Sequence, residues 1–472
     1  YGSATHFQGC YNVRVQDNVF FQNNWPQNVT YEPSFRSCAD IAFNALPASS
    51  QAGGRLIATG NFHFGQMSAA IFFNGGGGDQ GAIIANNHIQ PLDADGDPIT
   101  TGMNNRHGLA INYASETATR DTMVVVQANV IRYVRWAGIY CQTDDGADTG
   151  AIIIDSNVTD HTGIDDVSSL GGGIRVATGT GAPITISNNS ITEHQSTTTG
   201  GITIQATYAS ASSGRVMIQG NAVTRSVGMG IELVQINTNI DIFDNQIIDS
   251  GQNDIRFYQS ATQAESYRIR VMRNRIVRAN ATTYSVYVYG GVVNAYTVVI
   301  QDNWIVGNSK TTPTTAVNSA ICFSSTNSMG WFQIKGNHIE KFYRAITANG
   351  YFPAGRHANN IVIDGNDFLD CTYGIDFSAI ANTATILVTN STWNGVTNNF
   401  GTALLSGYPC LYEGVRNGAL FNVNSAAAPT TGTWIDGDAW TCTAPAVASA
   451  PGGICTTPGA TGVFVFTALA VL

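Results

Sequence analysis

Apolar and polar residues alternate along most of the chain, and asparagine interrupts this alternation at regular intervals. In residues 184–194 and again in residues 216–225, alternating apolar residues precede an asparagine, and another apolar residue stands two positions after it. Alternation with a period of two is the pattern of a β-strand that buries one face. Helical periodicity is nearly absent, so the pattern predicts an all-β protein.

The asparagine recurs about every 31 residues, and a fixed spacing of this size predicts a solenoid of stacked repeats. A buried turn needs partners for its backbone polar groups, and stacked Asn side chains supply them. Asn also tolerates the left-handed conformation of a sharp bend. We therefore assign these residues a structural role. The predicted ladder contains Asn18, Asn61, Asn87, Asn129, Asn157, Asn189, Asn221, Asn245, Asn274, Asn303, Asn337, Asn366 and Asn390.

A second recurring motif, Gly-Ile followed by alternating residues, lies between the asparagines. It begins at Gly138, Gly173, Gly201, Gly230 and Gly374, and related alternating segments occupy the same place in other repeats. Each repeat is thus predicted to hold one strand before the asparagine, a short strand after it, and a third strand at Gly-Ile. Successive repeats should pair in register about 4.8 Å apart.

This pattern resembles the right-handed parallel β-helix of the pectate-lyase-like superfamily over residues 1–400, with about 13 coils. The resemblance implies that the ladder lies between the second and third strands, and that the outer face of the Gly-Ile strands carries the substrate groove. Strand pattern begins almost at Tyr1. Because repeat arrays begin with a cap, we expect the natural protein to continue upstream.

The repeat ends after Asn390. Residues 401–424 are interpreted as a transition, and residues 425–472 as a linker with a small C-terminal β segment that caps or oligomerises. Residues Gly432, Thr433, Trp434, Gly437 and Asp438 resemble a terminal segment of bacteriophage tailspikes.

Composition narrows the partners. The 472-residue chain has 11% charged residues and a net charge of −10, which argues against nucleic acid and anionic membrane surfaces as ligands. No apolar run is long enough for membrane insertion. Neither a metal nor another cofactor is expected. Cys442 and Cys455 could pair, but the sequence leaves this open.

The first candidate site is a stripe of outward residues on the Gly-Ile strands. Tyr rings stack on pyranoses, and Arg binds the carboxylate or carbonyl groups of acidic sugars. Glu232, flanked by arginines, is expected to stay ionised and to act as a base or nucleophile. The alternative is a cross-strand salt bridge with surface tyrosines. The stripe comprises Tyr140, Arg175, Glu232, Arg256, Tyr258, Tyr287 and Tyr289.

The second candidate site lies in the bends that lead to these strands. It contains Asp160, His161, Asp166, Glu193 and His194. We expect Asp160 beside Glu193 and His161 beside His194 in adjacent coils. Two neighbouring carboxylates with divergent pKa values suit glycoside hydrolysis. The alternative is an exposed, solvated turn.

The tailspike resemblance implies a homotrimeric depolymerase of bacterial capsule or O-antigen, carried on a virion tail or secreted by a bacterium. Hydrolysis through Glu232, Glu193, Asp160 or Asp166 is the first hypothesis. A polysaccharide lyase using Arg175, Arg256, Tyr287 and His194 is the second. A non-catalytic glycan-binding fibre or adhesin is the third. A site between subunits, with Asp241, Asp364 or Asp376, also stays open.

Overall fold

The structure is a computed structural model, and it describes a set of segments along the chain. These are residues 5–8, 10, 12–21, 39–44, 55–64, 69–75, 81–92, 95–97, 107–113, 123–143, 151–164, 171–178, 183–206, 214–236, 238–259, 268–278, 283–290, 297–309, 318–325, 331–350, 361–380, 386–400, 410–413, 422–425, 439–442, 452–457 and 465–468.

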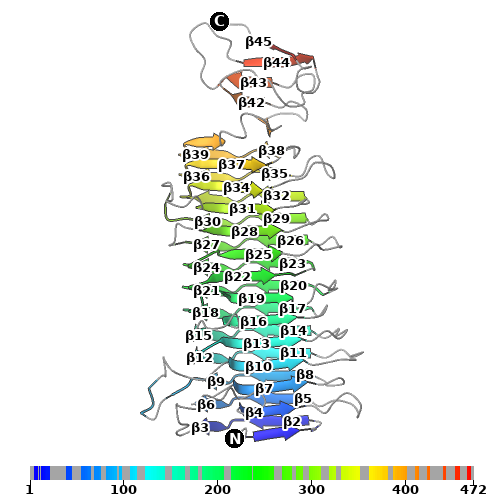
Figure 1. Ribbon diagram of the computed structural model, residues 1–472, viewed down its shortest axis with the longest axis vertical. Helices are drawn as coiled ribbons and strands as arrows, with labels where there is room; N and C mark the ends of the chain where they lie inside the picture. Colours follow the sequence, from blue (N-terminus) through cyan, green and yellow to red (C-terminus); the bar gives the residue numbers. More distant parts are fainter. Residues whose placement is uncertain are drawn as a thin grey trace. The chain divides into compact units, whose positions relative to one another are not determined.

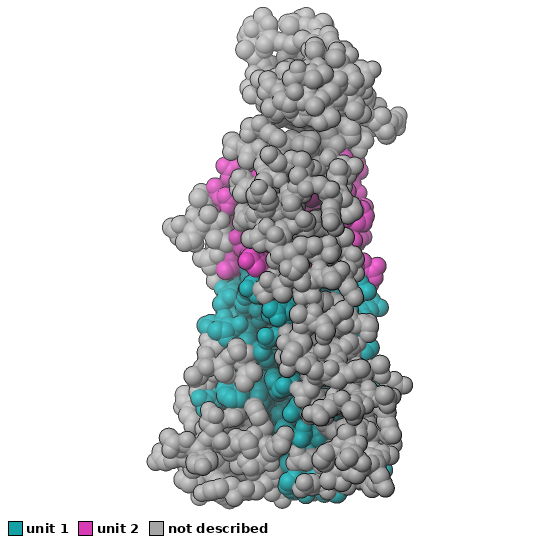
Figure 2. All heavy atoms as spheres, turned by 45° about the vertical axis from the view of Figure 1, so that its right-hand side comes forward, with its two compact units in different colours: residues 1–267, 274–280 teal, residues 268–273, 281–472 magenta. Residues whose placement is uncertain are grey.

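The chain divides into two compact units, coloured separately in Figure 2. Unit 1 comprises residues 1–267 and 274–280, and unit 2 comprises residues 268–273 and 281–472. Within each unit the strands fall into three parallel sheets, A, B and C, and successive levels follow chain order (Figure 1). One coil takes a strand from sheet B, then a short strand from sheet C, then a strand from sheet A.

In unit 1 the strands are as follows. Sheet A contains β1 (Thr5–Gln8), β4 (Ala39–Asn44), β7 (Ala69–Gly75), β10 (His107–Tyr113), β13 (Ala137–Thr143), β16 (Gly172–Thr178), β19 (Gly200–Ala206), β22 (Met229–Val234) and β25 (Ile255–Gln259). Sheet B contains β2 (Asn12–Gln16), β5 (Arg55–Thr59), β8 (Gly81–Ala85), β11 (Met123–Gln127), β14 (Ala151–Asp155), β17 (Ile184–Ser187), β20 (Val216–Gln219) and β23 (Ile240–Phe243). Sheet C contains β3 (Val19–Phe21), β6 (Phe62–Phe64), β9 (His88–Ile89), β12 (Val130–Val134), β15 (Val158–Thr162), β18 (Ser190–Thr192), β21 (Ala222–Thr224), β24 (Gln246–Ile248) and β27 (Arg275–Val277).

Unit 2 repeats the arrangement and adds a separate sheet. Sheet A contains β28 (Tyr284–Gly290), β31 (Ser319–Ser325), β34 (Arg344–Gly350), β37 (Tyr373–Ile380) and β40 (Asn398–Phe400). Sheet B contains β26 (Arg268–Met272), β29 (Thr297–Gln301), β32 (Trp331–Lys335), β35 (Ile361–Asp364), β38 (Ile386–Thr389) and β41 (Cys410–Glu413). Sheet C contains β30 (Trp304–Val306), β33 (His338–Glu340), β36 (Asp367–Leu369) and β39 (Thr392–Asn394). The separate sheet contains β42 (Asn422–Ser425), β43 (Ala439–Cys442), β44 (Gly452–Thr457) and β45 (Val465–Ala468).

These features confirm the predicted fold class: the described chain is an all-β parallel β-helix. Its strand order and Asn ladder are consistent with the right-handed form. The sheet formed by β42 to β45 begins with one parallel pairing and continues with antiparallel ones. The side chains of Cys442 and Cys455 lie outside the described part of the chain, so their pairing stays a prediction.

Stacked aliphatic side chains fill the interior of the coils. On sheet A of unit 1, Ile139, Ile174, Ile202, Ile231 and Ile255 form one buried, register-paired row. Such β-branched side chains suit a strand because their χ1 angles are already restricted there. The alternate residues point away from the coil interior, as the period of two requires.

In the coils that carry it, the glycine of the Gly-Ile motif leaves room for close neighbours on sheet C and on the next strand of sheet A. At Gly201, a Cβ would lie 2.7 Å from the Cγ1 atom of Val223 on sheet C and 3.2 Å from the backbone oxygen of Gly230. Gly173 is equally crowded. In the coil where Asp254 takes this place, its carboxylate lies 3.7 Å from Arg278, and both side chains are fully buried. Glycine therefore allows sheets A and C to approach closely at their bend.

The asparagine ladder forms as predicted and joins adjacent coils. Asn157 donates from its backbone nitrogen (2.8 Å) and from Nδ2 (2.9 Å) to Oδ1 of Asn189, and Nδ2 also donates to the carbonyl of Val126 (2.9 Å). Its own Oδ1 accepts the same pair of bonds from Asn129. The ladder thereby satisfies backbone groups that a buried bend would otherwise leave unpaired.

The assignment of Asn390 to the ladder is wrong. Ser391 occupies that position, and its Oγ accepts a bond of 3.3 Å from the backbone nitrogen of Asn366. Asn390 stands one residue earlier, with a φ of 49°. The two neighbouring residues are both short and polar, so the sequence pattern alone did not fix which one enters the ladder.

Candidate functional site

The outer face of sheet A carries the predicted stripe, and its register is confirmed in unit 1. The polar side chains alternate with the buried isoleucines, so one of them projects outward from each level between β13 and β25. The paired residues run in the order Tyr140, Arg175, Thr203, Glu232 and Arg256. A tyrosine, two arginines and a carboxylate are thus brought onto one face by residues spread over more than a hundred positions.

Glu232 is the centre of this stripe. Its Oε1 lies 3.4 Å from Nη1 of Arg256, and the Thr203 hydroxyl lies 3.5 Å from its Oε2. Glu232 is only 5% exposed, and this burial raises the pKa of its carboxyl, whereas Arg256, Arg175 and Thr203 act to lower it. Desolvation outweighs the arginines in the direction of this shift, and the expectation that Glu232 acts as an ionised base stays a prediction.

Arg175 is equally buried at 5% exposure. Its Nη2 donates to Oε1 of Gln205 at 2.6 Å. Burial lowers the pKa of the Arg175 guanidinium, and the nearby Tyr140 and Glu232 act to raise it. The stripe lies on the outer face, but the side chains at its centre are shielded from water. Charge interactions are stronger in such a shielded environment than at an open surface.

The tyrosines of the stripe are held by neighbours. The Tyr140 hydroxyl donates to Oε1 of Gln142 at 2.8 Å, and its ring stacks on buried His107 with centroids 4.6 Å apart. The Arg256 guanidinium lies 4.8 Å from the centroid of the Tyr258 ring. These contacts orient the rings of Tyr140 and Tyr258 in unit 1.

Tyr287 and Tyr289 belong to unit 2, where they form an aromatic group with Tyr284. The rings of Tyr284 and Tyr287 stack with centroids 4.6 Å apart, and Tyr287 and Tyr289 are 6.0 Å apart. Tyr287 pairs in register with Cys322 of β31. Burial raises the pKa of the Cys322 thiol to about 12, so this cysteine packs as an apolar residue.

The second predicted cluster has a different register from the one expected. Asp160 lies opposite Thr192, so Glu193 falls one residue further along, beside His161. The expectation that Asp160 meets Glu193 and that His161 meets His194 is therefore wrong. The ladder asparagine sets the level: Asp160 is the third residue after Asn157, whereas Glu193 is the fourth after Asn189.

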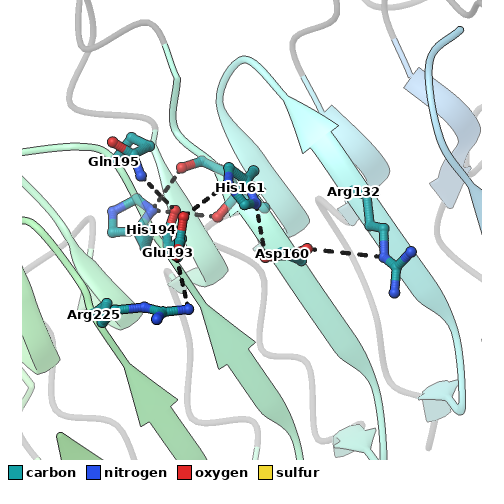
Figure 3. A network of polar contacts seen from close by, with 8 residues as sticks. Arg132, Asp160, His161, Glu193, His194, Gln195 and Arg225 are labelled. Atoms are coloured by element: carbon teal, nitrogen blue, oxygen red, sulfur yellow. Dashed lines mark hydrogen bonds and ion pairs between the residues drawn. The ribbon is translucent and has the colours of Figure 1, made fainter. Parts of the chain in front are cut away.

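These residues form a chain of charges across adjacent coils (Figure 3). The ring of His161 bridges the two carboxylates, with Nδ1 2.9 Å from Asp160 and Nε2 2.8 Å from Glu193. Arg225 lies 2.7 Å from Glu193, and Arg132 lies 3.9 Å from Asp160. Both carboxylates therefore point into ion pairs with their neighbours.

His194 is fully buried and lies behind this network. Its Nδ1 is 3.2 Å from the carbonyl oxygen of Thr162, and its Nε2 is 3.2 Å from the Thr199 hydroxyl. A Cβ at Gly163 would come within 2.6 Å of the imidazole. His194 therefore packs the bend from within, and this position argues against its predicted catalytic role. Asp166 lies outside the described residues.

Sequence reasoning missed a special backbone position in the bend between sheets C and A. The residue four places after the ladder asparagine has positive φ in consecutive coils of unit 1: Tyr133, His161, Glu193, Arg225 and Asp249. A left-handed conformation favours Gly or Asn and disfavours bulky side chains. The bend before the ladder follows that preference only in part: its left-handed residues include Gly60, Asn86, Asn188 and Gly220, but also Asp17, Ala128, Ser156 and Asp244. These positions could have been found from the sequence by counting four residues on from each ladder asparagine.

The three carboxylates considered for a site between subunits each have partners. Asp241 is paired with Arg215, and Asp376 with Arg344. Asp364 accepts bonds from the Thr389 hydroxyl (2.7 Å) and from Asn390 (3.1 Å). Their proposed role in a subunit interface stays a prediction.

In the described segments, no group of three or more His, Cys, Asp or Glu side chains is placed to hold a metal ion. The same part of the chain contains no helix that is long and apolar enough to cross a membrane.

Protein-family models give no match to the chain, and curated proteins give no significant match.

Proposed function

We propose that the chain binds and cleaves a bacterial surface polysaccharide, capsule or O-antigen, by glycoside hydrolysis. In this proposal it works as a homotrimeric depolymerase of the tailspike type, on a virion tail or as a secreted bacterial protein. The parallel β-helix of unit 1 supports the proposal because its paired strands align polar side chains on one face, where successive sugars of a polymer could bind. The observation that carries it is the environment of Glu232.

The proposal gives Glu232 the role of general acid. Burial raises its pKa, so that the proton is retained closer to neutral pH and can be given to the leaving glycosidic oxygen. Arg175 and Arg256 on either side suit acidic or carbonyl substituents of the sugar. Hydrolysis also needs a second carboxylate. The candidates for it are those of the sequence, Asp160, Asp166 and Glu193.

The test is digestion of a panel of capsular and lipopolysaccharide glycans, followed by mass spectrometry of the products. Saturated oligosaccharides are expected, and Glu232→Gln should reduce cleavage by about 10²–10⁴-fold while binding persists. Asp155→Asn is the control, because Asp155 also accepts a side-chain hydrogen bond, from Ser187, but lies on sheet B and has no role in the proposed site. Cleavage that is unchanged in Glu232→Gln would refute the site.

A polysaccharide lyase is the second candidate, and the pairing of Tyr140 with Arg175 favours it. The two residues are opposite one another in adjacent strands, and Tyr140 influences the pKa of the guanidinium. A tyrosine beside an arginine can serve as the base that removes the proton next to a uronate carboxylate, while the arginine binds that carboxylate. Unsaturated products, detected by ultraviolet absorbance and abolished by Tyr140→Phe, would select this reaction. Binding without any product would select the non-catalytic fibre.

A further inference from the structure

A second group of side chains with ligand-binding character lies on sheet C of unit 2. Trp304 in β30 is 51% exposed. The imidazole of His338 in β33 stacks on its indole, with centroids 4.0 Å apart and planes 24° apart. Trp304, His338, Asp367 and Thr392 are paired in register on successive strands of the outer face. A single exposed tryptophan does not by itself indicate a binding site, so the evidence for one here comes from the polar residues around Trp304.

The polar neighbours are held in fixed positions. His338 Nδ1 lies 2.8 Å from Asp367, and its Nε2 lies 3.5 Å from Glu340. The Thr392 hydroxyl donates to the other oxygen of Asp367. A carboxylate offers about four acceptor positions. Because the Asp367 side chain is 50% exposed, acceptor capacity remains for a ligand hydroxyl.

A cation completes the group. Lys341 Nζ lies 2.6 Å from Glu340, and the lysine has a φ of 60°, in the left-handed region. A lysine at this place is more strained than a glycine would be. The pKa of Glu340 is lowered chiefly by Lys341, and that of Asp367 chiefly by the Thr392 hydroxyl, so both carboxylates are ionised at neutral pH.

We propose that Trp304, Asp367 and Lys341 form a binding subsite for a neutral hexopyranose. The C–H face of the sugar would pack against the part of the indole that His338 leaves exposed, while its hydroxyls donate to Asp367 and accept from Lys341. The two ionised carboxylates oppose an acidic sugar, in contrast to the arginine-rich stripe of sheet A. This inference goes beyond the proposed function and does not need cleavage, because it concerns binding by unit 2.

The test is saturation-transfer difference NMR of the full chain with the methyl glycosides of glucose, galactose and mannose, and of glucuronic acid. Trp304→Ala should lose about fivefold or more of the neutral-sugar signal, as expected for loss of one aromatic stack. Trp331→Ala is the matched control, because Trp331 is also exposed (39%) but lies on sheet B of the same unit. Asp367→Asn should weaken the same signal.

Three results would overturn the subsite. They are equal signals for the two tryptophan variants, a glucuronide signal as strong as the neutral ones, and no signal from any neutral glycoside. Circular dichroism of each variant verifies that the β-helix is intact. The glycoside signal does not depend on cleavage, so a failure of the subsite is distinguishable from a failure of the cleavage proposal.

Discussion

Removing one interior ladder asparagine should weaken the β-helix far more than its small side chain suggests. In Asn157→Ala, the backbone N–H of Asn129 loses the acceptor that it contacts at 3.0 Å, and the carbonyl of Val126 loses the donor at 2.9 Å. Asn157 itself is fully buried. At about 1–3 kcal/mol for each unsatisfied group, the unfolding free energy should fall by about 2–6 kcal/mol.

The matched control is Asn18→Ala, at an exposed ladder position. Its side chain donates to the carbonyl of Gln16 and to Asn61, whereas the backbone N–H of Asn18 keeps its own bond to Asn61 after substitution. The expected loss is about 1 kcal/mol or less. Urea unfolding followed by circular dichroism compares the two variants. Equal midpoints would refute the view that the ladder works by satisfying buried backbone groups.

Three further outcomes are expected. Removing the cation in Arg256→Ala should raise the pKa of Glu232 further and move the high-pH limb of the cleavage rate to higher pH, measured as a pH–rate profile. His194→Ala should lower the unfolding free energy by about 2–4 kcal/mol and His161→Ala by less than about 1, in thermal unfolding, because only His194 is fully buried. The pKa values of Asp367 and Glu340 are lowered from their usual values of 3.8 and 4.5, so the ionised carboxylates stabilise the fold at a pH above those usual values. This stabilisation disappears as the pH falls through the lowered pKa values. The double variant Asp367→Asn with Glu340→Gln should therefore show a smaller decline of Tm between pH 6 and pH 3.

Each of these three predictions can be contradicted by a specific result. An unchanged pH limb in Arg256→Ala would mean that Glu232 does not limit the rate as an acid. Equal destabilisation by His161→Ala and His194→Ala would contradict the structural role of His194. An undiminished acid sensitivity in the double variant would show that other carboxylates control stability at low pH.

The sequence by itself determined the fold class and most of the register. A period of two identifies strands, and a repeated asparagine marks one bend in each coil. Because every coil is built in the same way, equal offsets from the motif place residues on one level. The order Tyr140, Arg175, Thr203, Glu232 and Arg256 followed from such counting alone. Counting failed where two short polar residues compete, as at Asn390 and Ser391.

Only the tertiary structure decided the chemistry of the individual groups. The partners that flank Glu232 could be named from the sequence, but the burial that raises the pKa of its carboxyl is a property of the folded chain. A shift of one residue at Glu193 replaced a carboxylate pair by a bridge through His161. Local periodicity fixes which face a side chain occupies, whereas desolvation and hydrogen-bond partners come from residues distant in the chain.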